Sequence, residues 1–276
     1  MHAADAFGTY VASVSRCPRS MNYTGAVMAT KKTLSASPAA AVPYFRPEAL
    51  KFLRALAKHN DRAWFQPRKG VFDAELKEPM LALVRKVTDA MLEFAPEYVR
   101  PAEKSLFRIY RDTRFSANKA PYKTHIAAWW PRHGCEKTSG AGFYFHVEAK
   151  EVIIAAGAWM PEKDQLAQIR HWLVDHHESF RKLLRSATLR KAFAEFEGNP
   201  LVRAPQGFDP EHPAMDLIRC RQWGLSVSLP PETALDPKLA ATVIRYFKLA
   251  TPVVNALNEP IVAAHAPKKK VLFGLR

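Results

Sequence analysis

The fold is decided by one stretch in the middle of the chain, Gly142-Phe-Tyr-Phe-His-Val-Glu-Ala-Lys-Glu-Val-Ile-Ile-Ala-Ala-Gly-Ala-Trp159. Its two halves, residues 142–149 and 152–159, are rich in the aromatic and β-branched side chains that favour strands. The residues Ala149-Lys-Glu151 between them predict a hairpin turn. Consecutive strands joined by such a short link pair in the antiparallel direction. The stretch therefore predicts an antiparallel sheet.

Further strands are predicted on either side of this hairpin. Residues 105–111 and 124–130 combine aromatic and β-branched residues, and residues 222–229 alternate apolar and polar side chains. The alternation is typical of a strand with one buried face. We therefore expect the sheet to contain strands from well-separated parts of the chain.

Helical patterns precede, interrupt and follow the strands. Pro47 suits the first turn of an opening helix, and Asp61 suits the cap of the next one. Pro79 predicts a kink or a break within the helical region 71–94. Further helices are predicted over residues 162–177, 178–197 and 214–218, and from Asp236 to about residue 257. This order predicts an α+β fold, with a mainly antiparallel sheet and flanking helices in a single compact domain.

The two ends of the chain differ from its middle in composition. Residues 1–43 are rich in Ala, Ser and Thr and contain a single acid, Asp5. We predict that this part is a disordered N-terminal arm. Folded sequence is expected over residues 44–260, and residues 261–276 are expected to form a basic C-terminal tail.

Charge and cysteine content narrow the class of protein. The net charge of +15 attracts nucleic acid, anionic lipid or phosphorylated ligands without choosing among them. The three cysteines lie far apart and form no C-x-x-C pair, which argues against both a disulfide framework and a zinc site. No apolar run approaches the roughly 18 residues of a membrane span. We expect a cytoplasmic protein with no membrane partner, no metal and no cofactor.

The strongest functional signal is a basic, aromatic stretch between Lys104 and His125. Six cations stand there against one acid, Asp112. Like charges this close repel one another, and Arg and Lys side chains suit the oxygens of phosphate or carboxylate groups. The sequence therefore predicts a site for an anionic small molecule, formed by Arg108, Arg111, Arg114, Lys119, Tyr122 and Lys123.

The same stretch contains candidate groups for proton transfer. Asp112 is the candidate general base, while Tyr122 and His125 are candidates to donate or shuttle protons. Strand alternation places Arg108 on the same face as Asp112 and places Arg111 on the opposite face. One ligand therefore cannot contact every cation, and the sequence does not establish whether the protein is an enzyme.

Two other interpretations of the basic stretch stay open. The protein could bind nucleic acid through it, although no helix-turn-helix, RNP-like or finger pattern is present. Alternatively, Asp112 and the arginines pair internally and pin the loop to the sheet, as in a structural adaptor without a ligand. The oligomeric state is not indicated by the sequence.

The basic stretch also carries a family resemblance. The string Phe107-Arg-Ile-Tyr-Arg-Asp-Thr-Arg-Phe-Ser-Ala-Asn-Lys-Ala-Pro-Tyr-Lys-Thr-His125 resembles the signature of domain-of-unknown-function family 2461, a group of bacterial and fungal proteins. Three further segments resemble other parts of that family: Phe52–Phe65, Ala156–Pro161 and Pro205–Leu217. The resemblance spans about residues 44–260. It implies family identity but no activity, because none is established for the family.

Overall fold

The computed structural model describes residues 42–135, 140–193 and 195–265. The expected N-terminal arm, residues 1–43, lies outside the described residues except for residues 42–43. The expected C-terminal tail, residues 261–276, lies outside them except for residues 261–265, which belong to the last helix. Among the described helices, none is both long enough and apolar enough to cross a lipid bilayer.

The centre of the molecule is a five-stranded antiparallel sheet with the strand order β1-β2-β3-β5-β4. Its strands are β1 (His125–Pro131), β2 (Gly142–Glu148), β3 (Val152–Ala158), β4 (Glu195–Glu197) and β5 (Trp223–Leu229). Strands β2 and β3 are the predicted hairpin, which is therefore confirmed. The predicted strands 124–130 and 222–229 are confirmed as β1 and β5, and the antiparallel α+β fold is confirmed with them.

One strand prediction is wrong in part. Residues 105–111 do not form a strand, because Ala102–Ser105 is a single turn of helix, α6, and only Leu106 and Tyr110 form isolated bridges. The segment still follows the outer edge of β1, where the Phe107 N–H donates to the carbonyl of Ala127. Local composition predicts extended backbone correctly, but it does not predict whether a partner strand lies in register.

The short strand β4 is a second difference between the structure and the sequence prediction. The sequence predicted a helix over residues 178–197, whereas the last three of these residues pair with β5. Helix α8 (Ala187–Ala192) accounts for part of the predicted helix. Pairing with a strand that follows later in the chain overrides the local helical pattern.

The first helices agree with the prediction. Helix α2 (Pro47–Lys58) begins at its proline, and the Asp61 carboxylate accepts a hydrogen bond of 2.8 Å from a backbone N–H of α3 (Arg62–Phe65). The break at Pro79 takes the form of a π-helical turn, η3 (Asp73–Lys77), followed directly by α5. The other elements are η2 (Gln66–Arg68), α4 (Lys69–Phe72), α5 (Glu78–Met91), η4 (Pro96–Tyr98), α9 (Met215–Ile218) and η5 (Pro231–Leu235).

Two helices are longer than predicted. Helix α7 (Lys163–Leu184) is continuous where two helices were expected, because no glycine or proline interrupts it. The final helix, α10 (Leu239–His265), runs through Pro252 and Pro260, although the prediction ended near residue 257. Its apolar side is buried against the rest of the molecule, and such packing outweighs the cost of an internal proline.

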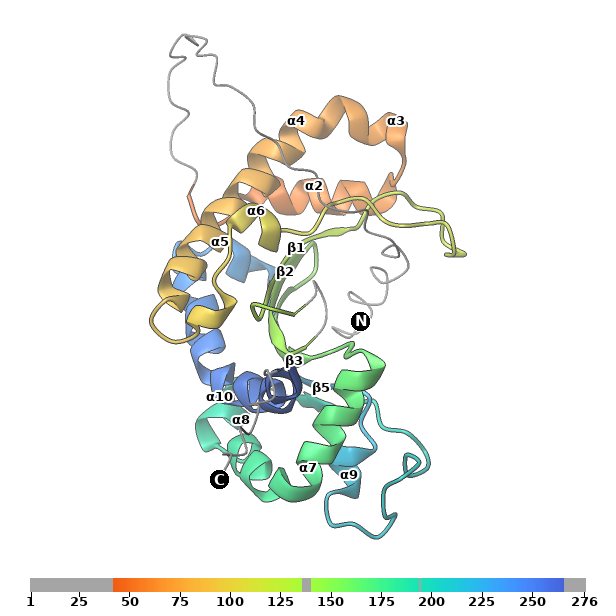
Figure 1. Cartoon of the computed structure of the whole chain (residues 1–276). Coiled ribbons are helices and arrows are strands. Elements are labelled where there is room, and N and C mark those ends of the chain that lie inside the picture. The colour runs from red at the N-terminus through yellow and green to blue at the C-terminus, as the bar shows by residue number, and fades with distance from the viewer. Residues whose placement is uncertain (1–41, 136–139, 194, 266–276) are drawn as a thin grey trace, which may run out of the picture.

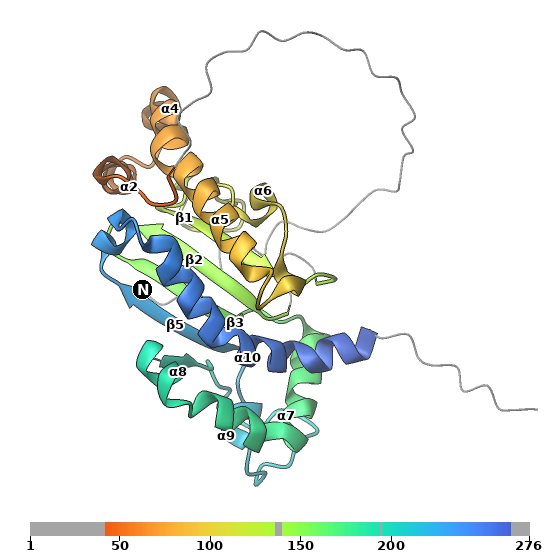
Figure 2. The same cartoon turned by 90° about the vertical axis from the view of Figure 1, so that its left-hand side faces the viewer.

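Helices α5 and α10 cover one face of the sheet, which we call the helix-covered face (Figures 1 and 2). Aromatic rings join the two layers: the Phe247 ring of α10 lies 5.2 Å from the Trp130 ring of β1 and 4.9 Å from the Phe143 ring of β2, centre to centre. Large buried rings thus form the core between helices and sheet.

The opposite face of the sheet, which we call the second face, has a different composition. Strand alternation directs His125 and Trp129 of β1 and Tyr144 and His146 of β2 to this face, and all four side chains are buried. Phe107 packs against this group. In Figure 1 the segment that follows Phe107 extends from the edge of the sheet on the side away from α5 and α10.

Candidate functional site

The predicted basic stretch forms an irregular arm, residues 107–123, that leaves the sheet beside β1 and returns to it (Figure 1). Its base is closed by backbone hydrogen bonds, one of which runs from the Lys123 N–H to the Ile109 carbonyl at 2.8 Å. The Asn60 side chain bonds both backbone groups of Tyr122, each at 2.9 Å. The helical layer therefore fixes the position of the base of the arm.

The cations near the tip of the arm are engaged within the arm itself. The Arg114 guanidinium donates to both oxygens of the Asp112 carboxylate, at 3.1 and 2.8 Å. Hydrogen bonds from Arg114 lower the pKa of Asp112 to about 2. Arg111 and Lys119 each donate to a backbone carbonyl of the arm at 3.1 Å. These contacts correspond to the internal pairing that the sequence left open.

Tyr122 lies in the core rather than beside an open site. Its side chain is 1% exposed, and its ring stacks on Phe65 with 4.1 Å between the ring centres. Burial raises the pKa of its hydroxyl. In this position Tyr122 supports the base of the arm through packing.

Arg108 lies at the base of the arm, away from the paired cations at its tip, and lines two cavities. The larger, of about 500 Å³, lies between α6 and the second face of the sheet. It is lined by Arg100, Glu103, Lys104, Ser105, Leu106, Phe107, Arg108 and Trp129. The smaller, of about 190 Å³, adds Lys69 and Lys77 to Arg108. Arg108 and Lys104 are both exposed, and neither forms an ion pair with another residue that the structure describes.

Lys123 extends this basic region towards the second face. Its side chain is only 7% exposed, and its ammonium group lies 4.8 Å from the centre of the Phe107 ring. Burial, together with the charge of Arg108, lowers the pKa of Lys123 to about 8. A lysine held this way keeps its charge near neutral pH and loses it more readily than an exposed one.

His125 lies beside Lys123 on the second face, and His146 lies next to His125. The rings of His125 and His146 stack with 4.9 Å between their centres. Burial and the charge of Lys123 lower the pKa of His125 to about 3, and burial also lowers the pKa of His146 far below its usual value. Both imidazoles are therefore neutral at pH 7. The Tyr144 hydroxyl lies 2.9 Å from Nδ1 of His146.

The sequence predicted part of this arrangement and missed part of it. It identified Arg108, Lys123 and His125, which lie near one another at the edge of the second face. It missed His146, which the register places one strand away from His125. The sequence did contain a signal for it. His146 and Glu148 are two residues apart on a predicted strand, and residues with this spacing share a face.

The fold and the arm together define a two-layer α+β protein with a basic cavity at one edge of its sheet. A model of the conserved hypothetical proteins of domain-of-unknown-function family 2461 matches residues 48–255, and the chain belongs to that family. The match includes the arm and all five strands, which confirms the resemblance seen in the sequence. The chain matches no curated protein and no solved structure.

Proposed function

We propose that the protein binds a small, phosphate-bearing anion in the cavity of about 500 Å³ beside Arg108. Its size is within the range of ligand sites in proteins, roughly 300–1,000 Å³. Phe107 and Trp129 supply apolar walls that suit the uncharged part of such a ligand. A location in the cytoplasm belongs to the same proposal, in keeping with the free thiols of Cys135 and Cys220.

The excess of positive charge around the cavity carries the proposal. Arg100, Lys104 and Arg108 line it together with one acid, Glu103. The Glu103 carboxylate accepts a hydrogen bond of 2.9 Å from the Arg85 guanidinium, so its charge is already balanced from outside the cavity. An anion bound between Lys104 and Arg108 would reduce their mutual repulsion, and arginine forks fit phosphate oxygens in two-pronged geometry.

The proposed site contains fewer of the basic residues than the site expected from the sequence. Arg108 belongs to it directly, and Lys123 adds positive charge from beneath Phe107. Arg111, Arg114 and Lys119 are left out because each already donates a hydrogen bond within the arm. The proposal thus assigns different roles to the two ends of the same basic segment.

Matched double variants test this division. We expect inorganic pyrophosphate to raise the melting temperature of the wild type and to bind measurably in isothermal titration calorimetry. The pair Lys104→Gln and Arg108→Gln should weaken that binding at least about tenfold, because a charge-assisted hydrogen bond contributes roughly 1.5–3 kcal/mol. The pair Arg114→Gln and Lys119→Gln removes the same charge and should change the affinity less than about twofold.

Two outcomes would overturn the proposal. One is an equal loss of affinity in both double variants, which would indicate a nonspecific effect of net charge. The other is the absence of binding by inorganic phosphate, pyrophosphate and a panel of phosphorylated metabolites.

A DNA duplex serves as a further probe. Tight binding of the duplex would favour a nucleic-acid-binding protein instead. In that case log K should fall by about 0.9 per phosphate contact for each tenfold increase in salt concentration.

A further inference from the structure

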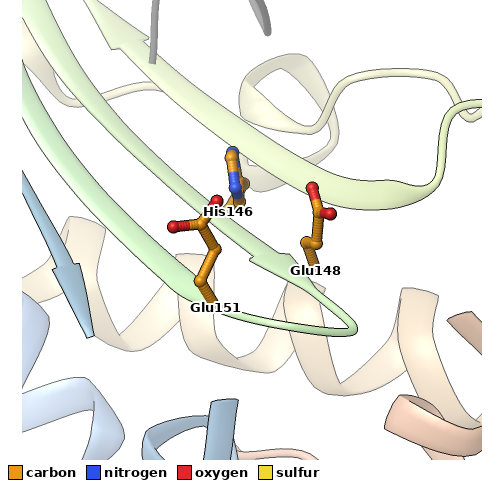
Figure 3. Close-up of side chains that lie close together, drawn as sticks. All are labelled: His146, Glu148 and Glu151. Atoms are coloured by element: carbon orange, nitrogen blue, oxygen red, sulfur yellow. The ribbon is translucent and has the colours of Figure 1, made fainter. Parts of the chain in front are cut away.

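The hairpin of β2 and β3 brings three potential metal ligands together. One ring nitrogen of His146 and one carboxylate oxygen from each of Glu148 and Glu151 lie within 4.8 Å of one another. Figure 3 shows the three side chains rising from the same side of the hairpin, with His146 between the two carboxylates. Two ligand atoms bound to one ion in tetrahedral geometry, with bonds of about 2.1 Å each, are about 3.4 Å apart. Small side-chain rotations of the glutamates are therefore enough to reach bonding distance.

The backbone explains why these residues meet. His146 and Glu148 are two residues apart on β2, so their side chains share one face. Glu151 follows across the hairpin turn, which is closed by a hydrogen bond of 2.9 Å from the Glu148 N–H to the Glu151 carbonyl. The group thus belongs to one rigid hairpin.

Neighbouring hydroxyl groups hold two of the three side chains in place. Ser228 of β5 donates to Oε2 of Glu151 at 2.5 Å, which leaves Oε1 of that carboxylate for another partner. The Tyr144 hydroxyl lies beside Nδ1 of His146. When Nδ1 carries the proton and donates it to this hydroxyl, Nε2 presents a lone pair, as a metal-bound histidine requires.

The unsatisfied chemistry of the group points to a ligand. His146 is 3% exposed, and its Nε2 has no hydrogen-bond partner among the described residues. A polar atom buried in this way is costly unless something binds it. Glu148 and Glu151 are both half-buried, and neither forms an ion pair with a described residue. The carboxylates of Glu148 and Glu151 bring two like charges within 4.8 Å of each other, so they repel.

We propose that His146, Glu148 and Glu151 bind one divalent transition-metal ion. One imidazole nitrogen with two carboxylate oxygens is a mixed set that suits Zn²⁺ or Mn²⁺, whereas Ca²⁺ and Mg²⁺ prefer oxygen ligands alone. The ion would neutralise the repelling carboxylates and satisfy the buried nitrogen. This site is separate from the basic cavity, so the inference goes beyond the proposed anion binding and is tested without any anion.

The test uses the full chain without an affinity tag, after removal of bound metal with a chelator. Calorimetric titration with ZnCl₂ and with MnCl₂ should show one ion per chain for at least one of the two, and weaker binding of MgCl₂. Glu148→Gln and Glu151→Gln should each weaken binding at least about tenfold, since even partners outside the ligand set change affinity by 10–100-fold. His146→Gln should abolish it.

A neighbouring pair in the same sheet offers a matched control. Ser226 donates to Glu197 as Ser228 donates to Glu151, two residues apart along β5, but Glu197 does not belong to the group around His146. Glu197→Gln should therefore bind the metal as the wild type does. The inference is overturned if the wild type binds neither ion, or if Glu148→Gln and Glu151→Gln bind it unchanged. Both glutamates are only half-buried, so we expect these two variants to fold. They therefore decide the matter even if His146→Gln does not fold.

Discussion

On the helix-covered face of the sheet, Phe145 and Ile154 are fully buried beneath α5 and α10 in an apolar layer. On the second face, buried ionisable side chains stand among the rings instead: His125 and His146, with Lys123 beside them. Burying an ionisable group is unfavourable unless its charge is lost or balanced. The sheet therefore has its apolar core on one face and buried ionisable groups on the other.

The pKa values of the second face follow from this difference. Burial lowers the pKa of Lys123 and that of His125, so both groups are held in an environment that disfavours their charged form. On the helix-covered face, by contrast, the polar atom of Trp130 is matched by Thr88 of α5, whose hydroxyl accepts a hydrogen bond of 2.9 Å from the indole N–H.

The largest effect is expected from a pair of neighbouring substitutions in β3. Ile154 faces the helices and Ile153 faces the second side, so Ile154→Ala and Ile153→Ala remove the same atoms from opposite faces. Ile154→Ala should lower the free energy of unfolding by about 2–5 kcal/mol, because it leaves a cavity in a tightly packed layer. Ile153→Ala should cost about half as much, because its cluster is small. Urea unfolding measures both, and equal losses would contradict the division between the faces.

The second effect concerns the pH dependence of stability through Lys123. Its pKa is about 8 in the folded protein and about 10.5 in the unfolded chain. Between these values the unfolded chain holds a proton that the folded protein has released, so stability rises as the pH rises through this window. The gain is on the order of 3 kcal/mol at most. Subtracting the curve for Lys123→Met from that of the wild type isolates this contribution, and a flat difference between pH 8 and 10.5 would refute it.

The smallest effect concerns the polar pair on the helix-covered face. Thr88→Val leaves the Trp130 indole N–H without its acceptor, which should lower the free energy of unfolding by about 1–3 kcal/mol. Thr251→Val is the matched control, because the Thr251 hydroxyl donates to the carbonyl of Phe247, one turn earlier in the same helix. The control should change stability by less than about 0.5 kcal/mol. Chemical denaturation of both variants makes the comparison, and similar losses would contradict it.

Local patterns in the sequence predicted most of the sheet and helices. Alternation and β-branched content identified β2, β3 and β5, and the cap at Asp61 and the break at Pro79 were visible as single residues. The failures lie where distant segments decide the structure. Strand β4 exists because β5 pairs with it, and α10 continues past its prolines because its apolar side is buried.

The candidate site was only partly predictable for the same reason. Charge density identified the arm, but not the pairing of Arg114 with Asp112 at its tip. Tyr122 is fixed by Asn60, sixty-two positions earlier in the chain, which no local pattern reveals. His146 was visible as a strand residue, yet its value as a ligand depends on Glu151 across the turn.

The edges of the sheet have a consequence for the behaviour of the protein at high concentration. An open edge strand offers unpaired backbone groups to another molecule and promotes aggregation. Here one edge, β4, is only three residues long, and the glutamate Glu197 lies on it. The outer edge of β1 is shielded by the bridge from Leu106 and the hydrogen bond from Phe107. Shortening the chain between α6 and Tyr110 would expose that edge, and edge-to-edge assembly between molecules should then increase.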